Sequence, residues 1–221
     1  MELKALKNAH ALEDVWVVAS DASVDYFPAG FFEGRTVITV NYAHVPARYC
    51  VSKNDEPTTA TRGSDWLTVE ANANPDTLFV VSKHRNGDLY RPKSHVPDAV
   101  IFDHHQNQVQ AFNAQTHIPD DTNMLLVSYS TIGSALHLAA FMGARTCFVA
   151  AGSGGVFGEE AYRASYHAKT TNTVVEAASR QTQPICDELQ RRYGTQFVTV
   201  LPWGNLRLGG DRFEADYGRL N

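Results

Sequence analysis

One histidine and two tyrosines stand close together in a polar stretch of the chain. Tyr162, Tyr166 and His167 follow a strand-like apolar run and a glycine-rich turn. A histidine can take or give a proton near neutral pH, and a phenol can donate a hydrogen bond to a departing phosphate oxygen. These residues are therefore candidates for acid–base chemistry at a phosphate ester. The alternative is that His167, one of nine histidines, is an ordinary surface residue.

A run of hydroxyl residues precedes a helix of small residues. Ser130, Thr131, Gly133 and Ser134 lie where that helix is expected to begin. Free backbone N–H groups at a helix N-terminus, together with hydroxyls and a glycine, form a ready anion site. The segment predicts either a phosphate-binding turn or a plain Ser/Thr cap.

Small polar side chains follow the first two expected strands. Ser20, Asp21 and Ser23 come after the first strand, and Asn41 ends the second. In a parallel sheet both positions lie at the carboxyl edge, where such sheets bind ligands. An amide there can exchange hydrogen bonds with a base or a ribose. Each residue alone also fits a cap or a strand-end turn, and the Gly-x-Gly-x-x-Gly pattern of dinucleotide sites is missing.

A metal site is considered because acidic residues and histidines cluster twice, as Asp103-His104-His105 and Asp120-Asp121. Adjacent residues on a strand point to opposite faces, so His104 and His105 do not readily converge on one ion. The Asp-x-Asp triplet of metal-dependent sugar transferases does not occur in the sequence. We therefore expect no metal and no resident cofactor.

The elements that position these residues are short apolar runs that alternate with helical stretches. Continuously apolar strands indicate a sheet covered on both faces, hence a mostly parallel one. Helical spacing predicts one helix over residues 134–143 and a second over 172–193, in which Pro184 should introduce a kink or a break. The expected fold class is a Rossmann-like, doubly wound α/β sheet with helices on both faces. Its strands are expected at residues 15–19, 36–40, 48–51, 78–81, 100–102, 146–150 and 197–200.

Length and composition set limits on organisation and location. A chain of 221 residues that is 43% hydrophobic can build one sizeable core, and we expect a single domain over residues 1–221. The net charge of -5 implies no broad attraction to nucleic acid. Neither a signal peptide nor an apolar run of membrane-spanning length is found. Together with three widely spaced cysteines, these features favour a cytoplasmic protein.

The order of these features resembles the bacterial sialyltransferases of glycosyltransferase family 42 and, more loosely, the related group that includes the hydroxymethylpterin pyrophosphokinases. In that family a small-residue turn follows the first strand, an Asn ends the second, and a hydroxyl–glycine turn opens a helix of small residues. A tyrosine-bearing loop, a catalytic histidine, a long helix and a late strand ending in proline follow. The likeness runs from Val15 to about Leu206, and the matching segments are 20–23, 41, 130–133, 162–167, the helix after Asn172, and 197–202.

The resemblance implies a transferase whose donor is a nucleoside mono- or diphosphate sugar. By that likeness Ser20, Ser23 and Asn41 lie near the nucleotide and its phosphate, and residues 130–134 surround the ribose and phosphate. Asp21 departs from the family pattern because it sets a negative charge beside an anionic donor. This departure weighs against CMP-sialic acid as the donor.

The resemblance also assigns the chemistry. His167 would deprotonate the acceptor hydroxyl, while Tyr162 and Tyr166 would stabilise the leaving phosphate without a metal. That division fits a sugar that leaves a phosphate, which needs charge neutralisation on one side and base assistance on the other. The acceptor could be a glycan, a metabolite or a modified nucleobase in phage-type DNA, and the family likeness suggests a homo-oligomer.

Two other functions are compatible with the same features. An ATP-dependent pyrophosphokinase acting on a hydroxymethylated heterocycle would need acidic residues for magnesium. A non-catalytic protein would bind the nucleotide without turnover. The magnesium candidates are Asp21, Asp103, Asp120 and Asp121.

A transferase that modifies DNA would need a basic groove for the nucleic acid. The candidates for that groove are Arg85, Arg91, Lys93, Arg163 and Lys169.

Overall fold

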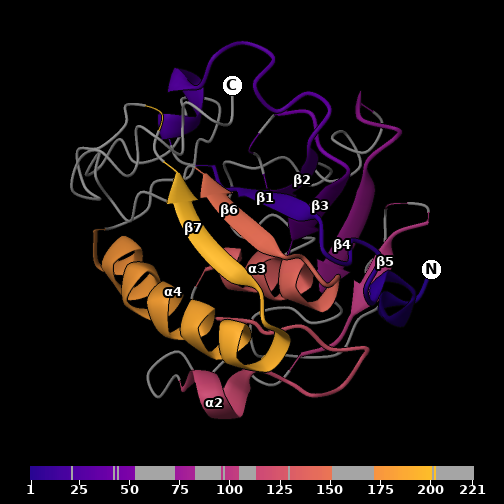
Figure 1. Cartoon of the computed structure of the whole chain (residues 1–221), viewed down its shortest axis with the longest axis vertical. Helices are drawn as coiled ribbons and strands as arrows, with labels where there is room; N and C mark the ends of the chain where they lie inside the picture. Colours follow the sequence, from indigo (N-terminus) through magenta and orange to yellow (C-terminus); the bar gives the residue numbers. More distant parts are fainter. Residues whose placement is uncertain are drawn as a thin grey trace.

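The centre of the molecule is a seven-stranded sheet in the order β5-β4-β3-β2-β1-β6-β7, in which every neighbouring pair is parallel (Figure 1). The computed structural model describes residues 1–20, 22–41, 43, 45–52, 73–82, 96, 98–104, 113–128, 130–150, 172–200 and 202, with the backbone alone for 172–179. The predicted α/β class is confirmed, and a strand forms at each of the seven predicted places. Their bounds are β1 (Asp14–Val18), β2 (Thr36–Val40), β3 (Tyr49–Ser52), β4 (Leu78–Ser82), β5 (Val100–Phe102), β6 (Thr146–Ala150) and β7 (Gln196–Val200).

Successive side chains of β1 point to opposite faces of the sheet, and each face has its own apolar cluster. Val15 and Val17 belong to the apolar cluster on one face, whereas Trp16 and Val18 belong to the cluster on the other. All four side chains are almost fully buried. Burial on both faces favours apolar side chains at each of these four positions, which explains the continuously apolar run that follows Asp14.

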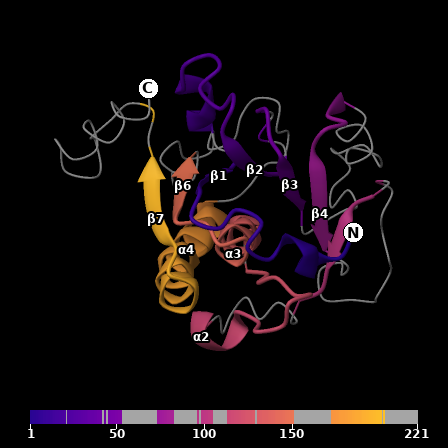
Figure 2. The same cartoon turned by 45° about the vertical axis from the view of Figure 1, so that its right-hand side comes forward.

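Helical segments cover both faces. α3 (Ile132–Phe141) and α4 (Asn172–Tyr193) lie together on the first face, with the short α2 (Ala114–His117) against α4 (Figure 2). The 3-10 helix η2 (Ala22–Tyr26) and the aromatic turn that follows it cover the second face. A further 3-10 turn, η1 (Leu3–Leu6), packs beside β5 and adds its leucines to the first face.

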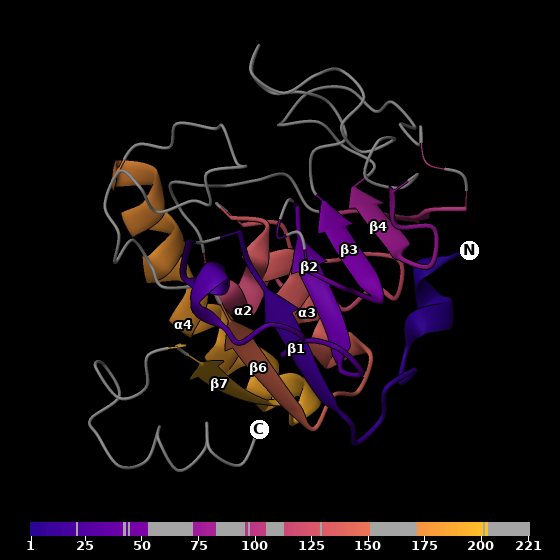
Figure 3. The same cartoon turned by 90° about the horizontal axis from the view of Figure 1, so that it is seen from above.

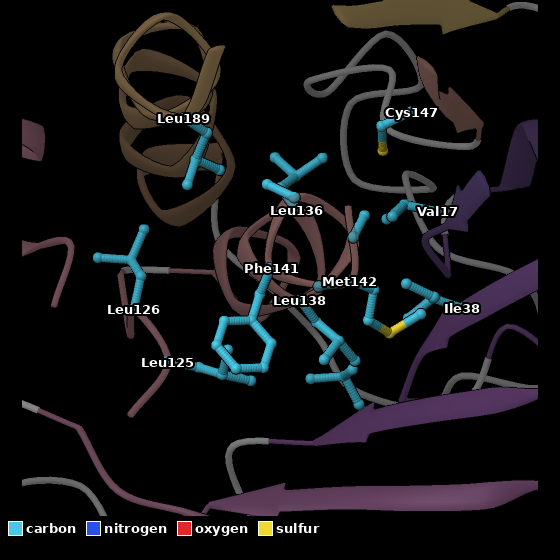
Figure 4. Close-up of a cluster of buried hydrophobic side chains, with 14 of the residues drawn as sticks. Val17, Ile38, Leu125, Leu126, Leu136, Leu138, Phe141, Met142, Cys147 and Leu189 are labelled. Carbon is cyan, nitrogen blue, oxygen red and sulfur yellow. The ribbon is translucent and has the colours of Figure 1, made fainter. Parts of the chain in front are cut away.

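α3 is the centre of the larger cluster. All ten of its residues are buried. Figure 4 shows Leu136 and Leu138 projecting from this helix among side chains of the sheet and of α4. A helix buried on every side needs apolar or small residues all around, which is what its sequence supplies. The predicted helix over residues 134–143 therefore forms, but it begins two residues earlier, at Ile132.

The end of α3 fixes its direction relative to the sheet. Gly143 follows the helix with φ 81°, the left-handed conformation expected of a C-terminal glycine. Backbone N–H groups before β1 donate to the last carbonyl of the helix and to the two that follow it, from Asn8 to Phe141, from His10 to Met142 and from Leu12 to Gly143. Because these partners lie just before β1, α3 ends at the amino edge of the sheet and begins at the carboxyl edge.

α4 runs without interruption through Pro184, so the predicted break does not occur. A proline inside a helix removes one backbone hydrogen bond, but tertiary packing can outweigh that loss. Here Ile185 and Leu189, just beyond the proline, are at most 1% exposed and belong to the larger cluster. Among the described helices, α4 included, none combines the length and the apolar character needed to cross a bilayer.

A clasp centred on Arg192 ties α4 to the segment around α2. Its guanidinium donates to the Glu188 carboxylate at 2.6 Å, to the carbonyls of Ile118 and Gln115 at 3.0 and 2.7 Å, and to Asp120 at 2.6 Å. Hydrogen bonds from Arg191 and Arg192 lower the pKa of Glu188 to about 2. One planar guanidinium therefore satisfies four acceptors in a fixed geometry.

Arg192→Lys is expected to lower the free energy of unfolding by about 1–2 kcal/mol, because an ammonium group cannot reach both carbonyls and the carboxylates at once. Urea denaturation measures this change. Arg145→Lys is the control, since Arg145 forms an exposed ion pair with Asp14 and such pairs contribute little. Equal losses in the two variants would contradict the structural role given to the clasp.

Candidate functional site

The strand order reverses at β1. From β1 the chain proceeds through β2 to β5 on one side, and it then returns to place β6 and β7 on the other side. Figure 3 shows β1 flanked by β2 and β6. In open parallel sheets the crevice outside the carboxyl ends of the strands at such a reversal is where ligands bind. The carboxyl ends of β1 and its neighbours are therefore the candidate site.

Most of the described candidate residues lie at this edge. Ser20 and Ser23 follow β1, and Asn41 follows β2 directly. Ser130 and Thr131 also lie there, because α3 begins at the carboxyl edge. Residues that are more than a hundred positions apart in the sequence are thus brought to one edge of one sheet.

Asn41 has the most unusual backbone at the site. Its φ is 52°, in the left-handed region that residues other than glycine rarely adopt. Its side chain is partly exposed, and the side-chain amide makes no hydrogen bond with any residue that the structure describes. A partly exposed amide at the end of a central strand can donate to and accept from a ligand.

The two serines after β1 are buried. The Ser20 hydroxyl donates to the carbonyl of Val40 at 2.8 Å, and the residue is 5% exposed. Ser23 lies in η2 and is 0% exposed. Ser20 thus uses its hydroxyl inside the protein, between the end of β1 and the end of β2.

Ser130, which lies just before α3, accepts hydrogen bonds from the first N–H groups of the helix. The N–H groups of Ile132 and Gly133 donate to the hydroxyl and the carbonyl of Ser130, both at 3.3 Å. Thr131 is 5% exposed, and within the described segments its hydroxyl has no hydrogen-bond partner. The helix N-terminus therefore combines long internal hydrogen bonds with one uncommitted hydroxyl, and a phosphate oxygen could accept from these groups.

Gly133 and Ser134, two further candidates, face the protein interior. A Cβ atom on Gly133 would lie 2.6 Å from the Ser128 hydroxyl and 3.2 Å from the Ile185 side chain. The Ser134 hydroxyl donates to the carbonyl of Leu126 at 2.6 Å and is fully buried. The glycine is thus explained by close packing, and the serine by holding the chain that leads to α3.

His137 is a further buried residue of α3, and it hydrogen-bonds to two other segments. Its Nδ1 accepts from the N–H of Leu126 at 2.9 Å, and its Nε2–H therefore donates to the Tyr193 hydroxyl at 3.0 Å. Complete burial, with a smaller contribution from the charge of Arg192, lowers the pKa of His137 to about 3. The histidine is neutral at physiological pH and links α3, residues 125–128 and α4.

Sequence reasoning missed Ser128 as a residue that shapes the site. Its hydroxyl donates to the carbonyl of Ser130 at 2.9 Å and also lies against Gly133. Ser128 therefore helps to fix the turn from which Ser130 and Thr131 project. The available signal was its place at the start of the same hydroxyl-rich run.

The remaining candidates divide into two groups. Asp21, Tyr162, Tyr166 and His167 lie outside the described residues. Within the described part, no group of three or more His, Cys, Asp or Glu side chains could hold a metal ion. The acidic candidates there have protein partners: Asp103 accepts from the N–H of His104, Asp120 from Arg192, and Asp121 from the N–H of Asn123.

Comparisons with protein-family models and with curated proteins add no relative to this geometry. No protein-family model matches the chain. No curated protein matches it either. The features that describe the chain are therefore its parallel sheet, the reversal at β1, and the polar groups of Asn41 and the α3 N-terminus at the carboxyl edge.

Proposed function

We propose that the protein is a glycosyltransferase that moves a sugar from a nucleotide-sugar donor to an acceptor hydroxyl without a metal ion. The observation that carries the proposal is the position of two polar side chains at the carboxyl edge of the sheet, where the strand order reverses. The side-chain amide of Asn41 and the hydroxyl of Thr131 lack partners among the described residues, and both residues lie at the carboxyl edge. A nucleotide phosphate needs such donors, and a base or ribose needs such an amide.

The N-terminus of α3 supports a phosphate in particular. The helix dipole places partial positive charge at its first turn, and anions are stabilised there. The N–H groups of Ile132 and Gly133 donate to Ser130 over long distances of 3.3 Å. Since the described residues of this turn include no cation, the phosphate would be bound by backbone and hydroxyl groups.

The chemical step is assigned by the family resemblance. His167 takes the proton of the acceptor hydroxyl, whose oxygen forms the new bond to the anomeric carbon of the sugar. The bond from that carbon to the phosphate oxygen breaks, and the nucleotide leaves with the electron pair. Tyr162 and Tyr166 donate hydrogen bonds to that oxygen.

A thermal-shift screen with CMP, UDP, UDP-glucose and ATP, each with magnesium and with EDTA, tests the proposal. A ligand at one hundred times its dissociation constant should add about 2.7 kcal/mol to the free energy of unfolding. Stabilisation by a nucleotide or nucleotide sugar in EDTA supports a metal-independent transferase. A response only to ATP with magnesium supports the pyrophosphokinase, and the absence of any response contradicts the transferase.

Turnover separates the transferase from a nucleotide-binding protein without catalysis. Release of free nucleotide from the stabilising nucleotide sugar is measured with a glycan, a sugar metabolite or DNA with modified bases as acceptor. Acceptor-dependent release is the expected result. Binding without release in all three reactions would favour the non-catalytic alternative.

Thr131→Val is expected to weaken nucleotide binding roughly tenfold, because it removes one hydroxyl that would bond the phosphate and keeps the shape of the side chain. Isothermal titration of the nucleotide gives the dissociation constant. Thr195→Val is the matched control, since its hydroxyl donates to the carbonyl of Ala144 at 2.7 Å at the opposite edge of the sheet. Equal affinities in wild type and Thr131→Val would place the phosphate elsewhere.

A further inference from the structure

The backbone around Asn41 is held by groups from both neighbouring strands. The Ser20 hydroxyl, after β1, donates to the carbonyl of Val40 at 2.8 Å. The N–H of Asn41 donates to the carbonyl of Val51 in β3 at 3.1 Å. The Cys50 thiol, also in β3, donates to the carbonyl of Asn41 at 3.6 Å. Three consecutive backbone groups, the Val40 carbonyl, the Asn41 N–H and the Asn41 carbonyl, therefore each have a hydrogen-bond partner.

These contacts lie inside the protein. Ser20 is 5% exposed and Cys50 is 2% exposed, so water does not readily replace either donor. Asn41 itself has φ 52°. Asparagine adopts this conformation more readily than most residues other than glycine, but it is still less favourable than the right-handed one, so surrounding hydrogen bonds help to select it.

We infer that Ser20 and Cys50 are positioning residues, which hold Asn41 in its left-handed conformation and thereby direct its amide toward the bound nucleotide. This inference rests on the proposed function. It changes the role of Ser20, which the family resemblance placed near the nucleotide and its phosphate as a donor-binding residue. Ser20 acts through Asn41, and Asn41 alone of the two touches the ligand.

A double-mutant cycle on nucleotide affinity tests the inference. Ser20→Ala and Asn41→Gly are each expected to weaken binding of UDP or CMP, whichever binds wild type, roughly tenfold. Glycine keeps the left-handed backbone but removes the amide. The double variant should bind no more weakly than Asn41→Gly alone. If the two losses multiply, Ser20 contacts the ligand directly and the inference is wrong.

Substitutions of Cys50 give a second test. Cys50→Ala removes the donor to Asn41, whereas Cys50→Ser keeps a donor in the same position. We expect weaker nucleotide binding in Cys50→Ala and recovery in Cys50→Ser, with Thr195→Val binding like wild type. A loss of stability alone would affect Thr195→Val and Cys50→Ala in the same way, so equal affinities in these two variants would overturn the role of Cys50.

A measurement without ligand separates this inference from the proposed function. Asn41→Gly relieves backbone strain only while hydrogen bonds such as that from Ser20 hold Asn41 in the left-handed conformation. Its effect on the unfolding equilibrium constant should therefore be more favourable in wild type than in Ser20→Ala, by roughly fivefold. Failure of every nucleotide to bind wild type would refute the proposed function and leave this coupling measurable. Identical effects in the two backgrounds would refute the positioning role.

Discussion

Gly133→Ala is expected to lower the free energy of unfolding by about 3 kcal/mol. The new Cβ would lie 2.6 Å from the Ser128 hydroxyl and 3.2 Å from the Ile185 side chain. Both neighbours are held in place, Ser128 by its hydrogen bond to Ser130 and Ile185 by burial in α4. Alanine favours helix by up to about 1 kcal/mol, but this gain does not offset the overlap.

Urea denaturation of Gly133→Ala, Ser128→Ala and the double variant separates overlap from other causes. Ser128→Ala removes the hydroxyl at 2.6 Å and leaves its Cβ at 3.3 Å from the new methyl group. The double variant should therefore be more stable than Gly133→Ala alone. Additive losses in the double variant would show that contact with Ser128 is not what requires a glycine.

Acid is expected to destabilise the protein through His137. Burial lowers the pKa of this histidine to about 3, whereas in the unfolded chain it is near 6.5. The unfolded state therefore binds more protons as the pH falls below 6.5, and stability falls with it. The contribution of His137 is complete above pH 6.5 and should decrease by about 2 kcal/mol between pH 7 and pH 5.

The variants His137→Asn and Tyr193→Phe isolate this contribution. Asparagine can still accept from the N–H of Leu126 but does not titrate, so its unfolding free energy should vary less between pH 7 and pH 5. Tyr193→Phe removes the hydroxyl that pairs with Nε2 but keeps the histidine, so it should retain the wild-type dependence. Parallel pH profiles for wild type and His137→Asn would contradict the assignment.

Most of the sheet could be predicted from the sequence, because its strands are apolar on both faces. The segment with Val15 and Trp16 illustrates this: its two faces pack into different clusters, and both need apolar side chains. Of the two outcomes expected at Pro184, a kink or a break, the break does not occur, since the local rule for proline does not include the packing of Ile185 and Leu189 that keeps α4 continuous.

The edge of the sheet that carries the candidate site could also be predicted, but the hydrogen-bond partner of each hydroxyl could not. Ser20, Ser134 and Thr131 all follow the same pattern of small polar residues at the end of a strand or the start of a helix. In the fold, two of these hydroxyls are bonded to buried carbonyls. Only the tertiary position of Val40 and Leu126 decides which hydroxyl is left for a ligand.

The place of β1 inside the sheet, between β2 and β6, affects how the newly made chain folds. β1 is synthesised before the other described strands, and one of its edges can pair with β2 soon afterwards. Its other edge pairs with β6, which follows β2 to β5 in the sequence. An unpaired strand edge recruits other chains, and nascent proteins are vulnerable while it persists. A chain that stops before Thr146 leaves this central edge open, so interrupted synthesis should yield aggregates rather than a smaller folded sheet.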